Sequence, residues 1–116
     1  MNAFADPEID LSPGQVAQLL ERGEVELIDV REPHEREAGY IDGSRHVELE
    51  RLAGRSETIP RDRPVVFQCR LGIRSAMAAQ AFRAAGWDAR NLAGGIVAWV
   101  EDGLPIAPEG GRVADH

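Results

Sequence analysis

The chain has 116 residues, a length typical of one domain that buries its own core without a disulfide or a structural metal. It is 43% hydrophobic and 28% charged, a composition of globular rather than disordered proteins. Acidic residues outnumber basic ones 20 to 13, giving a net charge of −7, which argues against nucleic-acid binding through phosphate neutralisation. Every basic residue is an arginine, and the absence of lysine excludes a Walker A loop and a pyridoxal or other Schiff-base enzyme.

The sequence contains neither a membrane segment nor a targeting signal that we can identify. No apolar run approaches the ~20 residues of a membrane span. The first twelve residues have neither the basic region nor the apolar stretch of a signal peptide. We therefore expect a cytoplasmic protein that does not bind a membrane.

Strand and helix patterns alternate along the chain. Ser12, Pro13 and Gln15 predict a capped helix start, and Gly23 predicts its end. The run 64–68 consists of apolar or β-favouring residues, which is typical of a central parallel strand buried on both faces. In the first half of the chain we predict a helix over 12–23, a strand over 25–30, a helical turn over 33–37, a turn at 42–43 and a short helix over 48–53. In the second half we predict strands over 64–68 and 89–92 with a helix over 75–86 between them. A last helix over 94–103 and a frayed polar tail over 109–116 follow.

This alternation predicts an α/β domain with a parallel sheet and helices on both of its faces. Ligands of such sheets bind beyond the carboxyl ends of the strands. Cys69 directly follows the predicted central strand and precedes a helix, so it occupies a position typical of functional residues. It is also the one cysteine of the chain, which excludes an internal disulfide, a CxxC pair and a cysteine zinc site.

The loop 69–75 combines several features that suit a reactive thiol. Backbone N–H groups in such a turn converge, and the helix N-terminus adds its positive dipole end. Gly72 permits a backbone conformation closed to other residues. Arg70 and Arg74 add two permanent positive charges, so we expect a Cys69 thiolate to be stabilised and a small sulfur or phosphorus oxyanion to be attracted.

Three ordered motifs resemble the rhodanese family over about residues 9–107. The first comprises Asp29-Val30-Arg31-Glu32, Glu35 and Gly39-Tyr40-Ile41-Asp42-Gly43-Ser44, with Tyr40 where the family usually has histidine. The second is the loop Cys69-Arg70-Leu71-Gly72-Ile73-Arg74-Ser75, and the third comprises Leu92-Ala93-Gly94-Gly95-Ile96, Trp99 and Gly103-Leu104-Pro105. The sequence is most similar to single-domain thiosulfate sulfurtransferases.

The resemblance implies a single domain with a five-stranded parallel sheet, and a double-displacement reaction without a cofactor or metal. Cys69 would be the nucleophile that takes a sulfane sulfur from a donor such as thiosulfate. Arg70 and Arg74 would bind the anionic donor. The backbone from Leu71 to Ser75, which includes Gly72, Ile73 and Arg74, would hold the persulfide sulfur. Cyanide or a thiol would then accept the sulfur, with glutathione or thioredoxin as possible acceptors.

Other functions remain open at this point. Dual-specificity phosphatases of the cell-cycle type resemble this fold, but their loop is one residue longer; here four residues separate Cys69 from Arg74, and Ser75 stands at the phosphatase arginine position. An arsenate reductase would need a second cysteine. A non-catalytic rhodanese-like module or a sulfur-relay protein is the third alternative, although such modules usually lack the loop cysteine.

The remaining polar residues are interpreted as structural. We expect Asp29 and Arg31 to pair with each other or cap backbone groups, and His34 and His46 to be a surface and a strand residue. Trp87 and Trp99 should pack in the core or at its edge. The charged residues Glu32, Glu35, Arg36 and Glu37 have the pattern of a solvated charge run.

Overall fold

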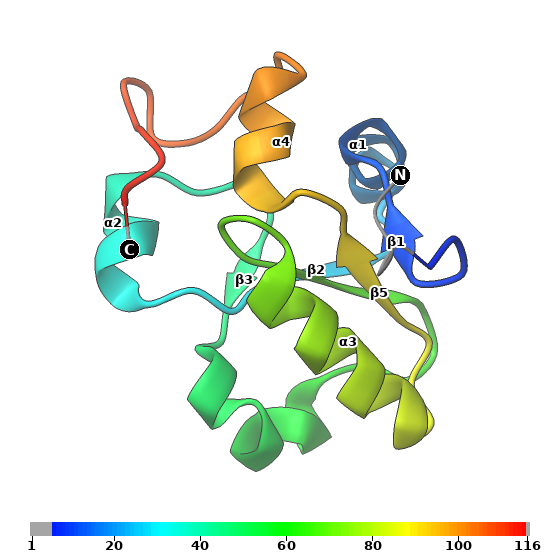
Figure 1. Ribbon diagram of the computed structural model, residues 1–116. Helices are drawn as coiled ribbons and strands as arrows, with labels where there is room; N and C mark the ends of the chain where they lie inside the picture. The colour runs from blue at the N-terminus through cyan, green and yellow to red at the C-terminus, as the bar shows by residue number, and fades with distance from the viewer. Residues whose placement is uncertain (1–5, 116) are drawn as a thin grey trace.

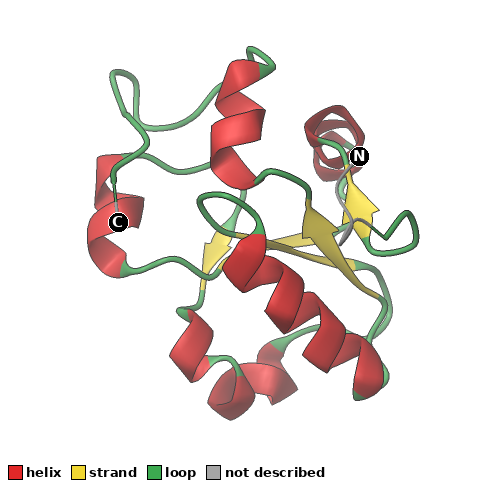
Figure 2. Cartoon of the chain, in the orientation of Figure 1, coloured by secondary structure: helices red, strands yellow, loops and turns green. Residues whose placement is uncertain are grey.

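The computed structural model describes residues 6–115 (Figures 1 and 2). The prediction on the N-terminal segment includes residues 1–5, and the prediction on the tail includes His116. These residues lie outside the described part of the chain. The strands are β1 (Asp10–Leu11), β2 (Glu26–Asp29), β3 (Arg45–His46), β4 (Val65–Gln68) and β5 (Ala89–Leu92). They form one parallel sheet in the order β1-β5-β4-β2-β3, which confirms the predicted five-stranded parallel sheet.

Residues 6–115 contain six helical segments, five between strands and α4 after the last strand, and most begin and end near the predicted residues. They are α1 (Pro13–Glu21), α2 (Pro33–Ala38), the 3-10 helices η1 (Leu49–Arg51) and η2 (Ala53–Thr58), α3 (Ile73–Ala84) and α4 (Gly95–Glu101). The short helix expected over 48–53 is instead two 3-10 helices that extend to Thr58. The segment 54–58 has no apolar periodicity that would indicate a helix from sequence.

The start of α1 shows how local sequence determines an element. The Ser12 Oγ accepts a hydrogen bond from the Gln15 N–H at 3.2 Å, and the Gln15 Oε1 accepts from the Ser12 N–H at 2.9 Å. Gly23, just past the helix, adopts a positive φ of 69°, a conformation that few other residues take without strain. The predicted capping box and glycine stop are both confirmed.

The sheet is buried on both faces, as the apolar run of β4 predicts. Val65 and Phe67 pack on the face covered by α3, whereas Val66 packs on the face covered by α1 and α4 (Figure 1). All four β4 residues are buried, so this strand is the centre of the domain. Trp87 and Trp99 are buried in these two clusters, as predicted.

The residues after 109 differ from the frayed tail that their polar sequence predicts. The Arg112 N–H donates to the Ala38 carbonyl at 2.8 Å, and Ala114 is buried. The chain passes so close to α2 here that a Cβ at Gly39 would overlap the Arg112 carbonyl. These contacts use backbone groups and a glycine, which periodicity in the sequence does not reveal. None of the helices over residues 6–115 has the length and apolar character to cross a bilayer.

Candidate active site

Cys69 directly follows β4, as predicted, and its sulfur is surrounded by hydrogen-bond donors. The Gly72 N–H points at the Sγ at 3.1 Å and the Ser75 N–H at 3.4 Å, while the Ser75 Oγ lies 3.2 Å away. Both N–H groups belong to the turn that starts α3, where backbone donors have no partner within the helix. Donors that converge on one point form a site for a negatively charged group. Cys69 itself is buried, at 1% exposure.

The first turn of helix α4 holds the Cys69 loop in place through two backbone hydrogen bonds. The Ile96 N–H donates to the Cys69 carbonyl at 2.9 Å, and the Val97 N–H donates to the Arg70 carbonyl at 3.1 Å. A Cβ at Gly95 would overlap both carbonyls, so the loop reaches these donors only because this residue is glycine. The sequence predicted Gly94-Gly95 as a helix start, and the structure adds the close approach that requires Gly95.

Glu35 overturns one prediction from the sequence. The sequence places it in a solvated charge run, yet its side chain is fully buried and pairs with Arg74. Its Oε2 and Oε1 accept from the Arg74 Nη1 and Nη2, each at 2.9 Å, and the Oε2 also accepts from the Glu32 N–H at 2.9 Å. Glu35 therefore ties α2 to the Cys69 loop, 39 residues further along the chain.

The pair shifts the pKa of both partners. Burial by itself raises the pKa of Glu35, but the hydrogen bonds from Arg74 and the Glu32 N–H outweigh it and lower the pKa from 4.5 to about 2. The hydrogen bond to Glu35 likewise raises the pKa of Arg74, which stays charged. Arg74 thus brings a cation to the loop together with its own buried counter-ion.

Asp29 and Arg31 form the structural pair that the sequence predicts. The Arg31 Nε and Nη2 donate to the two Asp29 carboxylate oxygens at 2.9 Å, and both side chains are fully buried. The Arg31 Nη2 also donates to the Gly39 carbonyl at 2.8 Å. Together these contacts fix the end of β2 to the far end of α2, so they support the helix that carries Glu35.

Arg70 is held by the carboxyl-terminal segment. Its Nε donates to the Ala114 carbonyl at 3.2 Å, and its Nη2 lies 3.5 Å from the Asp115 carboxylate. Asp115 is fully exposed, so this ion pair is weak. The tail expected to be frayed therefore positions one of the two arginines that flank Cys69.

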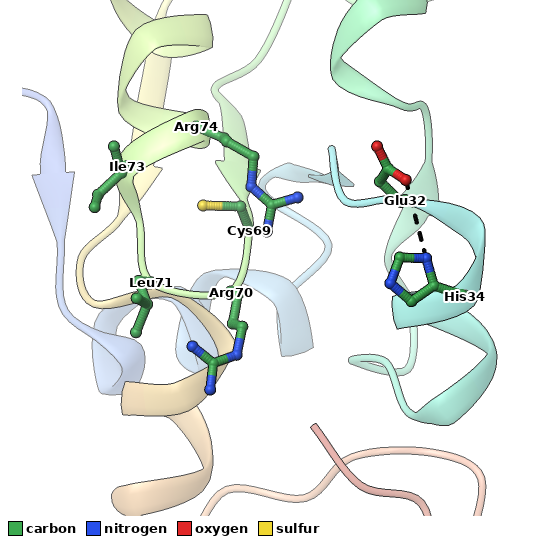
Figure 3. Close-up of a pocket in the computed structure, with 7 residues that line it drawn as sticks. All are labelled: Glu32, His34, Cys69, Arg70, Leu71, Ile73 and Arg74. Carbon is green, nitrogen blue, oxygen red and sulfur yellow. Dashed lines mark ion pairs between the residues drawn. The ribbon is translucent and has the colours of Figure 1, made fainter. Parts of the chain in front are cut away.

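A pocket of about 470 Å³ opens over Cys69 (Figure 3). Four loop residues predicted from sequence line it, namely Arg70, Leu71, Ile73 and Arg74. Glu32 and His34 face this loop from the start of α2, with the His34 Nδ1 3.9 Å from the Glu32 Oε2 (Figure 3). His34 is a surface residue, as predicted, but its place at the pocket follows from the pairing of β2 with β4, which no local pattern indicates.

Within residues 6–115, no group of three or more His, Cys, Asp or Glu side chains is arranged to hold a metal ion. The chemistry available here is that of a recessed thiol, surrounding N–H and hydroxyl donors, and two guanidinium groups at the pocket.

Comparison with known proteins assigns the family. The family model of the rhodanese-like domain matches residues 12–102. The chain belongs to the rhodanese family. A sulfurtransferase of Allochromatium vinosum is 40% identical over 105 residues, which are 89% of this chain and 97% of that protein. The thiosulfate sulfurtransferase GlpE of Shewanella oneidensis is 37% identical over 92 residues, which are 78% of this chain and 91% of that protein.

Solved structures of rhodanese-like domains share the fold. The crystal structure of a rhodanese-related protein from Thermoplasma volcanium superposes with a TM-score of 0.79 at 26% identity, covering 85% of this chain and 97% of that one. Together with the sulfurtransferase relatives, this likeness supports a rhodanese-type sulfurtransferase in general terms.

Proposed function

We propose that this protein transfers a sulfane sulfur from thiosulfate, or a similar anionic donor, to cyanide or a thiol through a persulfide on Cys69. The observation that carries the proposal is the ring of donors around the Cys69 sulfur at the floor of a pocket flanked by Arg70 and Arg74. The curated name of the Shewanella relative, a thiosulfate sulfurtransferase, supports thiosulfate as the donor to test first.

In the first step the Cys69 thiolate attacks the outer sulfur of thiosulfate. A new sulfur–sulfur bond forms to Cys69, and the original sulfur–sulfur bond breaks with its electron pair leaving on sulfite. In the second step cyanide attacks the outer sulfur of the persulfide and leaves as thiocyanate, which returns the Cys69 thiolate. With a thiol as acceptor, the products are the acceptor's persulfide and the same thiolate.

The flanking residues have separate parts in this proposal. Arg74 keeps N–H donors beyond the two that Glu35 accepts, since a guanidinium has five. These donors and the Arg70 guanidinium would face the sulfonate end of the donor. The N–H groups of Gly72 and Ser75 would stabilise the cysteine sulfur when it is expelled as a thiolate.

Phosphatase activity is the weaker alternative because of the loop length. With four residues between Cys69 and Arg74, the loop is one residue shorter than that of the phosphatases that resemble this fold. A non-catalytic regulatory module is disfavoured by the presence of Cys69 with its full set of donors. A sulfur-relay protein would use the same persulfide on Cys69, so these donors do not argue against it.

Intact-mass spectrometry after incubation with thiosulfate tests the proposal. We expect the protein to gain the mass of one sulfur atom, and cyanide or dithiothreitol to remove it. Cys69→Ser, which contains no thiol, is the control and should gain nothing. Sulfur transfer to cyanide by folded Cys69→Ser would exclude the mechanism, and a wild type that never gains mass would favour a non-catalytic module.

A further inference from the structure

The Ser75 hydroxyl lies between two groups that can both accept its single proton. Its Oγ is 2.6 Å from the Asn91 Oδ1 and 3.2 Å from the Cys69 Sγ. All three side chains are buried, with exposures of 0% for Ser75, 3% for Asn91 and 1% for Cys69. Because these side chains are shielded from solvent, the Ser75 hydroxyl has one proton for two acceptors, the Asn91 Oδ1 and the Cys69 Sγ. It can donate to only one of them at a time.

The Asn91 amide can present only its oxygen to Ser75. Its Nδ2 donates to the Asp10 Oδ1 at 2.9 Å and to the Gly72 carbonyl at 3.3 Å, and both partners are acceptors. The second Asp10 oxygen accepts from the Asp6 N–H at 2.9 Å, which fixes the carboxylate on edge strand β1. This arrangement leaves the Asn91 oxygen as a dedicated acceptor for the Ser75 hydroxyl.

The direction of that hydroxyl matters for the charge on sulfur. When Ser75 donates to Asn91, its lone pairs face Cys69, which suits a neutral S–H donor and disfavours a thiolate. When the sulfur is charged, the hydroxyl stabilises it by turning to donate to the Sγ, at the cost of the bond to Asn91. A hydrogen bond to the charged form of a group favours that form.

We propose that Asn91, held by Asp10, is a positioning residue that competes with Cys69 for the Ser75 proton and so limits how readily the resting thiol ionises. The proposal rests on the proposed function, because it assigns a means of setting the reactivity of the same sulfur. It concerns a residue on β5 and one on β1, neither of which lines the pocket over Cys69.

Other charged groups face Cys69 and stay constant in the test. They are Arg70 beside the sulfur with the exposed Asp115 paired to it, Arg74 with its buried partner Glu35, and the Glu32–His34 pair across the pocket. None of them contacts Asn91 through a hydrogen bond among the described residues. A change caused by substituting Asn91 therefore acts either through the Ser75 hydroxyl or through the Gly72 peptide, and the Ser75→Ala background distinguishes the two.

The experiment measures the rate of Cys69 alkylation by iodoacetamide as a function of pH. Asn91→Ala frees the hydroxyl to donate to sulfur, so we expect the pH midpoint of alkylation to fall by about one to two units, the equivalent of one charge-assisted hydrogen bond. Ser75→Ala should raise the midpoint. In the double variant, the Asn91→Ala substitution should have no effect, since the hydroxyl that it frees is absent.

Asp10→Ala provides a second variant in case Asn91→Ala does not fold. Without its anchor the amide can turn and offer its Nδ2 to Ser75, so the midpoint should fall by a smaller amount. Asp88→Ala is the matched control, because it also removes one carboxylate, from a partly exposed site outside the network, and should leave the midpoint unchanged.

A midpoint that rises or stays fixed in both Asn91→Ala and Asp10→Ala would overturn the proposal. So would a fall that persists in the Ser75→Ala background, because Asn91 would then act only by holding the Gly72 peptide. Alkylation requires no sulfur donor. The result is therefore independent of whether thiosulfate forms a persulfide on Cys69.

Discussion

Glu35→Gln tests the buried ion pair between α2 and the Cys69 loop. The Glu35 pKa falls from 4.5 to about 2 in the folded protein. At 1.36 kcal/mol per unit, this difference corresponds to about 3 kcal/mol of stability. Because the pKa is lowered on folding, that contribution is fully present above pH 4.5 and is lost as the pH falls toward 2.

The substitution keeps the size of the side chain and removes its charge. A glutamine oxygen can still accept from the Glu32 N–H, so the helix start should persist. Arg74 instead loses its counter-ion. We expect the free energy of unfolding to drop by about 3 kcal/mol at pH 7 and to change little near pH 2, where the wild type has also lost the pair.

Urea unfolding between pH 7 and pH 2.5 measures the effect, and Glu37→Gln is the matched control. Glu37 lies on the same helix but is exposed, so its substitution should change the free energy by less than about 0.5 kcal/mol. Parallel stability curves for the wild type and Glu35→Gln across this pH range would refute the assignment of the lowered pKa to the pair with Arg74.

Three further predictions concern activity. Folded Arg74→Ala should lower kcat/KM for thiosulfate about ten- to a hundredfold, with partial recovery in Arg74→Lys, because a charge-assisted hydrogen bond contributes about 1.5–3 kcal/mol; steady-state kinetics that match the wild type would contradict this. Truncation after Val113, which keeps the Arg112 bond to α2, should raise KM for thiosulfate about two- to tenfold, since Arg70 loses the Ala114 carbonyl that orients it, and an unchanged KM would count against that role. Hydrolysis of an aryl phosphate should be negligible beside sulfur transfer, and efficient hydrolysis would invalidate the argument from loop length.

Local patterns predicted those features of the fold that depend on local physics. The Ser12 capping box lies within four consecutive residues, and the buried run of β4 is continuous in sequence. The place of Cys69 followed from one topological rule about the carboxyl ends of parallel strands. The number of strands came from the family resemblance instead, because β1 and β3 have two residues each and no detectable pattern.

Features that depend on long-range contacts could not be predicted in this way. Glu35 has the same sequence environment as the exposed Glu32 and Glu37, and only the meeting of α2 with the Cys69 loop buries it against Arg74. The tail is polar in sequence, yet its backbone bonds to α2 and positions Arg70. In both cases the two contacting residues are more than thirty positions apart in the sequence. Such a contact produces no periodic pattern of residues that could be recognised from the sequence.

The charge balance at Cys69 differs from what two neighbouring arginines suggest. Arg74 carries a buried carboxylate with it, so the pair adds little net charge to the site. Arg70 is held partly by a backbone carbonyl and faces solvent. The most direct stabilisation of a thiolate therefore comes from donors within 3.4 Å of the sulfur, the N–H groups of Gly72 and Ser75. Because such donors act at short range and are shielded from ions, they can stabilise negative charge that develops on a sulfur during transfer, without a positive surface around the site.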